Sequence, residues 1–315
     1  MHATKLQDLQ NTLCQAGIPC IGQESLAQHT TFRIGGPAAL YCMPATAQQL
    51  QTVLRSCKAC AVPYCLLGNG SNVLFSDAGY DGMVVSLCNL TEPLQCTETE
   101  TEVQITAGAG ITLNRLCAFA QQRGLAGLAF AFGIPGTVGG AVYMNAGAYG
   151  GEVKDVLREV TFLDEQLQLR TLPAEQLELG YRTSVIEHHD WCIVSVVFAL
   201  KRGDAAAIQA EMMEYMARRK DKQPLEYPSA GSTFKRPQGA FAGKLISDCG
   251  LAGFTVGGAQ VSEKHCGFVI NRGGATCEDV LKLTEQVKEI VLKKTGYTLE
   301  REIRVVPTHS REAEQ

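Results

Sequence analysis

The segment FGIPGTVGGAVYMNAGAYGGE, residues 132–152, holds seven glycines in 21 residues. Glycine loses more conformational freedom on folding than any other residue, so such a density needs a reason. The spacing differs from the G-x-G-x-x-G pattern that follows the first strand of a Rossmann fold. The segment therefore predicts bare backbone on which a large flat cofactor lies. A glycine-rich loop constrained only by packing is the alternative.

A second glycine-containing loop lies earlier, in LLGNGSNVLF at residues 66–75. An apolar strand runs directly into G-N-G-S-N, where two glycines allow the backbone to approach a ligand closely. Successive N–H groups, with Ser71 and Asn72, could surround a pyrophosphate. The alternative is a tight β-turn, because N-G and S-N are common turn formers.

The pattern around these loops alternates strands and helices. Strands are expected at 39–45, 63–68, 83–87, 102–110, 268–271 and 299–306, and helices at 47–59, 112–124, 204–222 and 278–296. The helices are predicted by apolar residues at 3.6-residue spacing and the strands by short apolar or alternating runs. A β-α-β unit is expected near the N-terminus. At roughly 150 residues per domain, 315 residues predict two or three domains.

Composition excludes several classes of protein. Lys plus Arg is 28 and Asp plus Glu is 32, so the net charge is −4, which argues against a general nucleic-acid binder. The longest apolar run, residues 191–200, is about half the length that a membrane span needs. We expect no membrane insertion and a cytoplasmic location.

The 13 cysteines are expected to be mostly free thiols in a reducing compartment. Cys57 and Cys60 have C-x-x-C spacing, and Cys65 follows, but no second pair or histidine set completes a zinc site. We expect no metal and interpret these cysteines as small buried apolar residues.

The segment PSAGSTFKRP, residues 228–237, places Ser232 after a glycine and before two cations, Lys235 and Arg236. It is neither the G-x-S-x-G of a nucleophilic serine nor a phosphate-binding P-loop. Taken alone, Arg182 in LGYRTSVI, Lys222 before a proline, and Glu302 in LEREIR would each be interpreted as solvated surface charges.

Taken together and in order, these motifs resemble one known family. They are HTTFRIGG (29–36), LGNGSN (67–72), IPGTVGGA with MNAGAYG (134–150), GYRTS (180–184), KQP (222–224), AGSTFKRP (230–237) and LEREIR (299–304). The set closely resembles the UDP-N-acetylenolpyruvoylglucosamine reductases, also called UDP-N-acetylmuramate dehydrogenases. The resemblance spans nearly the whole chain.

The resemblance implies an α+β protein. Its FAD-binding fold would be of the vanillyl-alcohol-oxidase-like (PCMH) type in two N-terminal parts, followed by a C-terminal α+β substrate-binding domain. We place the first part at 1–78, joined by the C-terminal strand 299–315, the second at 79–203, and the substrate domain at 204–298. The activity implied is NADPH-dependent, FAD-mediated reduction of UDP-N-acetylglucosamine enolpyruvate to UDP-N-acetylmuramate for peptidoglycan. A monomer is implied.

The resemblance also assigns residues. Ser232 would be the proton donor, with Arg182 and Glu302 completing the catalytic set. Non-covalent FAD would contact Arg33, Gly68, Asn69, Gly70, Ser71, Asn72, Ile134, Pro135, Gly136, Thr137, Gly139, Gly140 and Ala141. The substrate would contact Lys222, Tyr149, Tyr181, Lys235, Arg236, Asn271 and Arg304.

Two departures from the family pattern stand out. Only 49 residues separate Arg182 from Ser232, so the substrate-closing loop of one branch of the family is absent, as in the shorter, second type. Arg236 stands where many relatives have asparagine, and an arginine–phosphate contact is expected to replace the amide.

Two alternative functions stay open at this point. One is a flavin oxidase on the same cofactor fold, although neither glycine-rich segment offers the His or Cys that often tethers FAD in such enzymes. The other is a non-catalytic nucleotide-sugar binding protein.

Overall fold

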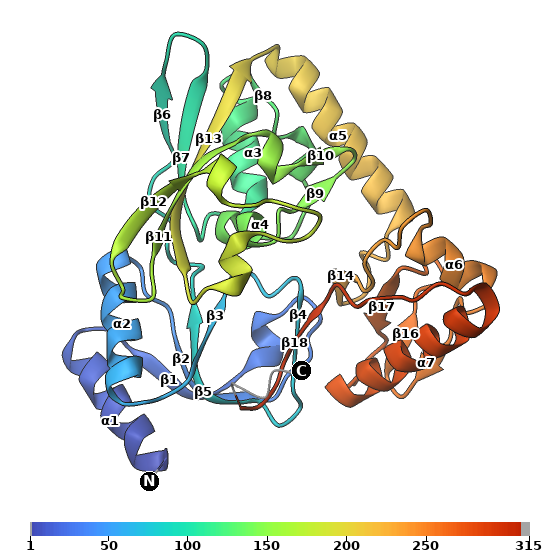
Figure 1. Ribbon diagram of the computed structural model, residues 1–315, viewed down its shortest axis with the longest axis horizontal. Helices are drawn as coiled ribbons and strands as arrows, with labels where there is room; N and C mark the ends of the chain where they lie inside the picture. Colours follow the sequence, from blue (N-terminus) through green and yellow to red (C-terminus); the bar gives the residue numbers. More distant parts are fainter. Residues whose placement is uncertain (1, 310–315) are drawn as a thin grey trace. The chain divides into compact units, whose positions relative to one another are not determined.

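The computed structural model describes residues 2–309, which form two compact units (Figure 1). Unit 1 comprises the chain up to Cys20, then Cys42–Asn69 and Val84–Arg219. Unit 2 comprises Ile21–Tyr41, Gly70–Met83 and the chain from Lys220 onward. The domain boundaries expected at 79 and 204 stay predictions, and residues 310–315 of the expected C-terminal strand lie outside the described part.

Unit 1 is built on a six-stranded sheet. Its strands have the order β12-β11-β13-β7-β6, and β8 also pairs with β13. Their bounds are β6 Gln95–Glu98, β7 Val103–Gly108, β8 Leu125–Ala126, β11 Leu157–Leu163, β12 Leu169–Pro173 and β13 Cys192–Arg202. Every pairing in this sheet is antiparallel, so short connections suffice.

Helices α3 (Leu113–Gln121) and α4 (Val138–Tyr143) contribute to the core of unit 1. The inward residues of β7, β11 and β13 alternate along each strand, as a half-buried sheet requires. They form one apolar cluster with Leu116 and Ala120 of α3 and Val138 and Ala141 of α4. The middle of the glycine-rich run thus lies on helix α4, which packs against the core of unit 1.

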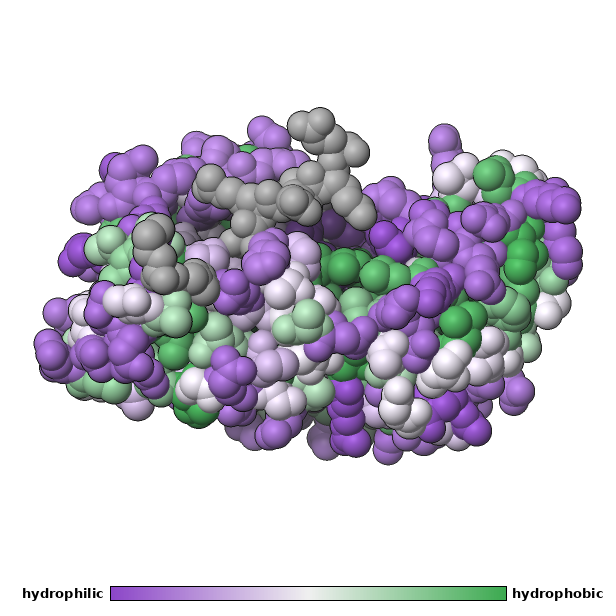
Figure 2. Space-filling model, turned by 90° about the horizontal axis from the view of Figure 1, so that it is seen from below, coloured by the Kyte–Doolittle hydropathy of each residue, from purple (hydrophilic) through white to green (hydrophobic). Residues whose placement is uncertain are grey.

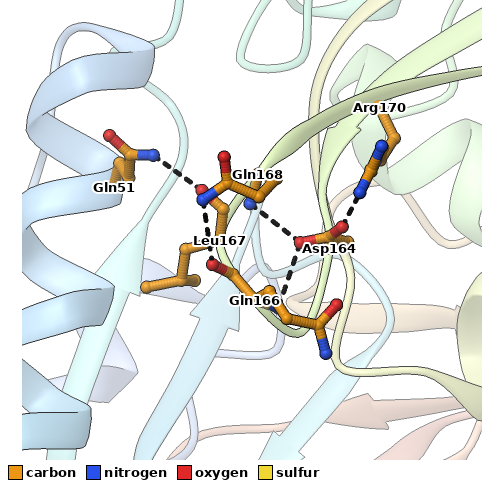
Figure 3. A network of polar contacts seen from close by, with 6 residues as sticks. All are labelled: Gln51, Asp164, Gln166, Leu167, Gln168 and Arg170. Atoms are coloured by element: carbon orange, nitrogen blue, oxygen red, sulfur yellow. Dashed lines mark hydrogen bonds and ion pairs between the residues drawn. The ribbon is translucent and has the colours of Figure 1, made fainter.

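The turn between β11 and β12 is tied to helix α2 (Ala47–Ala59), as Figure 3 shows. Leu167 has φ +58°, and its carbonyl accepts a hydrogen bond from Gln51 Nε2 at 2.6 Å. The Asp164 carboxylate accepts from the backbone N–H groups of Gln166 and Gln168 at 3.0 and 2.8 Å, and from Arg170 Nε at 3.0 Å. One acidic side chain therefore fixes the whole turn.

Unit 2 contains an antiparallel sheet and a long amphipathic helix. The sheet has the order β14-β17-β16-β15, with β14 Ser229–Ser232, β15 Thr255–Val256, β16 Ala259–Val261 and β17 Phe268–Asn271. Helix α7 (Cys277–Thr295) buries Val280, Leu283, Val287 and Val291 in the same apolar cluster as Val261 and Val269 of this sheet. Helix α6 (Ala242–Asp248) adds Ile246 to the cluster.

The N-terminus of α7 is capped twice. Thr276 and Asp279 form a reciprocal capping box, and Gly296 ends the helix with φ +76°. Asp77, about two hundred residues earlier in the chain, accepts from the N–H groups of Cys277 and Glu278 at 2.7 and 3.1 Å. The caps explain why the helix expected at 278–296 forms almost within the predicted bounds.

A two-stranded parallel pairing joins the end of the described chain to a segment near residue 74. Strand β18 (Arg304–Val306) pairs in parallel with β4 (Val73–Phe75), within unit 2. Residues 299–303 form no regular strand, so only the end of the strand expected at 299–306 is confirmed. A separate four-stranded sheet has the order β1-β2-β5-β3, with β1 Cys20–Ser25, β2 Pro37–Cys42, β3 Tyr64–Leu67 and β5 Tyr80–Ser86.

The other elements complete the chain. They are α1 His2–Gln15, α5 Ala205–Lys222, β9 Gly147–Ala148, β10 Gly151–Glu152 and five short 3₁₀ turns. Helices α2 and α5 confirm those expected at 47–59 and 204–222, whereas α1 was not expected. Among the described residues, no helix is long and apolar enough to cross a bilayer. Figure 2 shows a face on which hydrophilic side chains predominate, with hydrophobic ones between them.

Candidate functional site

The first half of the G-N-G-S-N loop lies against the glycine-rich run in unit 1. Asn69 Nδ2 donates to the Pro135 carbonyl at 2.8 Å. A Cβ on Gly68 would lie 2.7 Å from Thr137 Oγ1, so no larger residue fits there without a shift. The two glycine-containing segments that the sequence singled out are therefore neighbours.

The second half of this loop lies in unit 2, as does the expected cofactor residue Arg33. Gly70 has φ +61°, and its carbonyl accepts from Thr31 N at 3.1 Å. A Cβ on Gly70 would stand 2.1 Å from the His29 carbonyl oxygen. Arg33 itself is exposed and has φ +55°.

The backbone N–H groups of Gly68, Asn69, Gly70 and Ser71 donate none of the backbone–backbone hydrogen bonds found in the turns and loops of residues 2–309. Asn69 is exposed and Gly68 and Ser71 are half-buried, so their N–H groups can bond either water or a ligand. Such a row suits the oxygens of a pyrophosphate. The loop thus has the donors that a dinucleotide cofactor needs.

Some glycines of the run 132–152 are closely packed within the protein, and at least one is exposed. A Cβ on Gly139 would lie 3.0 Å from Ala109 Cβ, and one on Gly151 would lie 2.7 Å from the Phe130 ring, so packing explains these two. Gly140 is exposed and meets only Thr137 Oγ1 at 3.4 Å. Thr137 caps α4 by accepting from Gly140 N. Packing therefore accounts for Gly139 and Gly151, whereas the exposed Gly140 is open to close approach of a ligand.

Arg182 is fixed in unit 1 beside the β9–β10 hairpin. It has φ +58°, and its Nη2 donates to the Gly147 carbonyl at 2.9 Å. The guanidinium lies 5.2 Å from the centre of the exposed Tyr181 ring. Burial acts to raise the pKa of Glu152, but hydrogen bonds from Lys154 and Asn145, with the charges of Lys154 and Arg182, together hold that pKa below its ordinary value.

Asn145 connects the M-N-A-G-A-Y-G and G-Y-R-T-S motifs. This residue is fully buried and has φ +42°. Its Nδ2 donates to Glu152 Oε2 and to the Gly180 carbonyl, both at 2.8 Å, and its Oδ1 accepts from Lys154 N at 2.9 Å. The two motifs, which are about 35 residues apart in the sequence, are thereby held together next to Arg182.

The expected substrate residue Tyr149 also lies in unit 1. Its ring stacks on Tyr215 of α5, with ring centres 4.5 Å apart and planes 5° from parallel. The Arg219 guanidinium lies 5.5 Å from the centre of the Tyr149 ring. Tyr149 has φ +53°, in the left-handed region that few residues other than glycine adopt.

Ser232 and Glu302 lie on adjacent segments of unit 2. Ser232 ends β14 and is exposed, whereas the next residue, Thr233, is 1% exposed. Thr233 N donates to Gly267 O at 2.8 Å, and its Oγ1 accepts from Val269 N at 2.9 Å. Glu302 N donates to Thr233 O at 2.8 Å. Buried hydrogen bonds at Thr233 therefore fix the backbone of both expected catalytic residues.

Asn72 joins the same arrangement from the G-N-G-S-N loop. Its Nδ2 donates to the Glu302 carbonyl at 3.2 Å, and its carbonyl accepts from Arg304 N at 3.0 Å. Three motifs distant in sequence, with Asn72, Ser232 and Glu302, thus meet in unit 2. Arg182, the third expected catalytic residue, belongs to unit 1.

Lys235, Arg236 and Lys222, three expected substrate residues of unit 2, each contact a neighbouring side chain. Lys235 Nζ is 2.5 Å from Glu300 Oε1, so its charge is balanced by a carboxylate. The Arg236 guanidinium lies 4.1 Å from the centre of the Phe241 ring. Lys222, at the end of α5, pairs with Asp221 at 3.3 Å. The two cations that follow Ser232 in the sequence, Lys235 and Arg236, therefore interact with Glu300 and Phe241.

Asn271 is buried and committed to backbone groups. Its Nδ2 donates to Phe32 O at 3.2 Å, and its Oδ1 accepts from Gly273 N and Ala275 N at 2.9 and 3.2 Å. Its own N–H donates to Pro228 O at the start of the serine motif. This geometry suits a residue that positions the loop around it.

His265 is a residue near Ser232 that the sequence interpretation missed. Its Nδ1 accepts from Gly267 N at 3.1 Å, and Gly267 O in turn accepts from Thr233 N. Burial lowers the pKa of His265, although a hydrogen bond at its own backbone opposes the shift. The only sequence signal was a histidine two residues before a glycine at the start of a buried strand.

Among residues 2–309, no group of three or more His, Cys, Asp or Glu side chains could hold a metal ion.

Comparisons with known proteins cover both units. Residues 223–306 match the model for the C-terminal domain of UDP-N-acetylenolpyruvoylglucosamine reductase, and residues 38–172 match an FAD binding domain. The chain is 46% identical to the UDP-N-acetylenolpyruvoylglucosamine reductase of Lachnoclostridium phytofermentans over 97% of this chain and 98% of that one. It is also 46% identical to the reductase of Agathobacter rectalis, over 97% and 99%.

A solved structure resembles the chain over nearly the same extent. The reductase from Thermus caldophilus is 34% identical, covers 92% of this chain and 99% of its own, and superposes with a TM-score of 0.75.

Proposed function

The chain belongs to the UDP-N-acetylenolpyruvoylglucosamine reductase family, and on this premise we propose how its own residues carry out the family's reaction. The reaction is the FAD-dependent reduction of UDP-N-acetylglucosamine enolpyruvate in peptidoglycan synthesis. The expected α+β fold, an FAD-binding fold with a C-terminal substrate domain, is confirmed. The alternative of a non-catalytic nucleotide-sugar binding protein is therefore rejected.

FAD, when bound, supplies the hydride for the enolpyruvyl double bond, and NADPH is the donor that we propose for its reduction. The residues present fit the cofactor. The N–H groups of residues 68–71 would bind its pyrophosphate, and the exposed Gly140 would lie against it. Arg33, Asn72 and the segment 134–141 would complete the binding surface.

Ser232 would donate the proton that completes the reduction. Addition of hydride to one carbon of the enolpyruvyl group leaves carbanion character at its neighbour, which must gain a proton on one face because the product is chiral. A side chain delivers a proton to one face only when its backbone is fixed. The buried hydrogen bonds of Thr233 provide that rigidity while the Ser232 hydroxyl stays exposed. This is the observation that carries the proposal.

Arg182 and Glu302 would handle the charge around the reacting carbon. The substrate carboxylate gains negative character as the carbanion develops, and a guanidinium can stabilise it through two parallel hydrogen bonds. Arg182, with one donor already bound to Gly147 O, is oriented for this role. Glu302 is placed by its backbone bond to Thr233 O and would orient the substrate or relay the proton to Ser232.

The remaining assignments concern substrate binding. Lys222 and Arg236 would contact the UDP phosphates, and Tyr149 and Tyr181 would contact the sugar nucleotide. Lys235, Arg304 and Asn271 would support the surface around them. We also propose that residues 1–78, 79–203 and 204–298 act as the two FAD-binding parts and the substrate domain, that the enzyme is a cytoplasmic monomer, and that FAD is bound without a covalent link.

The role of Ser232 is tested by single-turnover kinetics. Ser232→Ala is expected to slow the reoxidation of reduced FAD by the enolpyruvyl substrate by about 10²–10³-fold, while FAD binding and reduction by NADPH stay at wild-type levels. Ser247→Ala, an exposed serine of α6 in the same unit, is the matched control. Wild-type reoxidation in Ser232→Ala, or loss of FAD from it, would contradict the assignment.

A further inference from the structure

Thr31 of unit 2 lies between the loop expected to bind FAD and the strand that carries the expected proton donor. Its N–H donates to Gly70 O, in the G-N-G-S-N loop, at 3.1 Å. Its Oγ1 donates to Ser229 O at 2.7 Å, and its own carbonyl accepts from Ser229 N at 3.2 Å. Ser229 begins β14, the strand that ends at Ser232. One half-buried threonine therefore binds the loop through its N–H and the strand through its hydroxyl and carbonyl.

Strand β14 is irregular between its two ends. It pairs with β17, but the register of the pairing shifts between Ser229 and Ser232. Gly231 lies within the shift and has φ +75°. A shift of this kind bends the strand and re-aims the side chains that follow it. The direction of the Ser232 hydroxyl therefore depends on the contacts that hold each end of the strand.

The two ends of β14 are held by different contacts. At the far end, the buried hydrogen bonds of Thr233 fix the backbone next to Ser232. At the near end, Thr31 makes two hydrogen bonds with Ser229, and the shorter of them comes from the Thr31 side chain. A substitution can remove that side-chain bond without altering a backbone group.

We propose that Thr31 is a positioning residue for the reduction. Its hydroxyl fixes the start of β14 relative to the FAD-binding loop, and so sets where the Ser232 hydroxyl lies when the proton is transferred. The inference rests on the proposed function, in which Ser232 donates that proton. A donor that must reach one face of one carbon loses rate steeply when it is displaced, by up to about 10²-fold for about 1 Å. Thr31 acts through Ser232 and needs no contact with the substrate itself.

Thr31→Val tests the proposal, because valine keeps the β-branched shape and the backbone bonds and removes only the hydroxyl. In the FAD-bound enzyme, reoxidation of reduced flavin by UDP-N-acetylglucosamine enolpyruvate is expected to be about tenfold slower than in wild type. FAD affinity and flavin reduction by NADPH are expected to stay at wild-type levels. Thr31→Ser keeps the hydroxyl and is expected to restore most of the rate. Thr30→Val is the matched control, because Thr30 Oγ1 donates to Ile34 O within its own segment.

A double-mutant cycle separates positioning from a general structural effect. Because Thr31 acts through Ser232, Thr31→Val is expected to slow reoxidation by less than about twofold once Ser232 is replaced by alanine. A further loss of about tenfold in that background would overturn the proposal, and so would wild-type reoxidation in Thr31→Val. Wild-type reoxidation in Ser232→Ala alone would overturn the proposed proton donor together with this inference, so the two failures are distinguishable.

Amide hydrogen exchange of the FAD-bound protein gives a second readout, which does not depend on turnover. Residues 229–232 are expected to exchange about fivefold faster in Thr31→Val than in wild type or Thr30→Val, as the loss of one ordinary hydrogen bond at Ser229 predicts. Exchange of this segment at the wild-type rate would contradict the role given to the hydroxyl. Loss of FAD from Thr31→Val would also contradict it, because the bond from Thr31 N to Gly70 O remains in that variant.

Discussion

Replacing Asn145 tests how unit 1 holds Arg182. Asn145 joins the β9–β10 hairpin to Gly180 through three hydrogen bonds of 2.8, 2.8 and 2.9 Å, and its backbone has φ +42°. Asn145→Gly removes the three bonds and keeps a residue that tolerates positive φ. Asn145→Ala removes the same bonds and adds the strain of a Cβ in left-handed backbone.

The magnitude follows from these contacts. Each bond to a neutral backbone group contributes about 1 kcal/mol, and the bond to the Glu152 carboxylate about 1.5–3 kcal/mol. Lys154 is exposed, so in the variants a water molecule can accept from its backbone N–H and recover part of the lost hydrogen-bond energy. Asn145→Gly is therefore expected to lower the unfolding free energy by about 3–4 kcal/mol. For Ala, left-handed strain of about 1–2 kcal/mol exceeds the gain from a stiffer unfolded chain, about 0.4–1 kcal/mol. Ala is thus expected to be about 1 kcal/mol less stable than Gly.

The assay is denaturant unfolding of the apoprotein, followed by tryptophan fluorescence. Trp191 is the chain's single tryptophan and lies in unit 1, stacked on Phe162 and His189. FAD is omitted because weaker cofactor binding would lower the apparent stability by mass action. The reasoning is refuted if Asn145→Gly unfolds within about 1 kcal/mol of wild type, or if Asn145→Ala is as stable as Asn145→Gly.

Three further predictions concern the cofactor loop, a helix cap and a buried histidine. Gly68→Ala places a Cβ 2.7 Å from Thr137 Oγ1 and is expected to weaken FAD binding about tenfold in a flavin titration, whereas Gly22→Ala, with its nearest atom at 3.9 Å, leaves it unchanged. Asp77→Ala removes the cap of α7 and is expected to lower unfolding free energy by about 0.5–2 kcal/mol by circular dichroism; Asp77→Asn, which keeps an acceptor oxygen, is expected to lose less. Because burial lowers the pKa of His265, the unfolded chain takes up a proton first, so stability falls as pH drops below the unfolded pKa of about 6.5. His265→Gln is expected to lose less stability over that pH range, and an equal loss would show that His265 is not the group responsible.

Local signals in the sequence predicted much of the fold. The helix at 47–59 was predicted to the residue from the helical spacing of Leu50, Val53 and Leu54, and the structure adds Thr46 as its N-cap. Helix α7 followed from the same kind of pattern, with Gly296 as its end. These features depend on residues within one or two turns of each other, so a single sequence contains them.

Contacts between distant segments could not be predicted in this way. The Asp77 cap of α7, the pairing of β18 with β4 and the bond from Glu302 N to Thr233 O each join residues separated by long stretches of chain. Asn145 looked like one member of a glycine-rich motif, although its side chain is the buried link to Gly180. The contacts of the glycines with a cofactor stay predictions, whereas the space around Gly139, where a Cβ would lie 3.0 Å from Ala109 Cβ, depends on a segment distant in sequence.

The central claim is that this chain reduces the enolpyruvyl group of a UDP-sugar through bound FAD. The most direct measurement is anaerobic: record the visible flavin absorption of the purified protein, add NADPH, and then add UDP-N-acetylglucosamine enolpyruvate. We predict that the band bleaches with NADPH and returns with the sugar nucleotide, as UDP-N-acetylmuramate forms. A band that bleaches but does not return would contradict the substrate assignment, and a protein that binds no flavin would contradict the account as a whole.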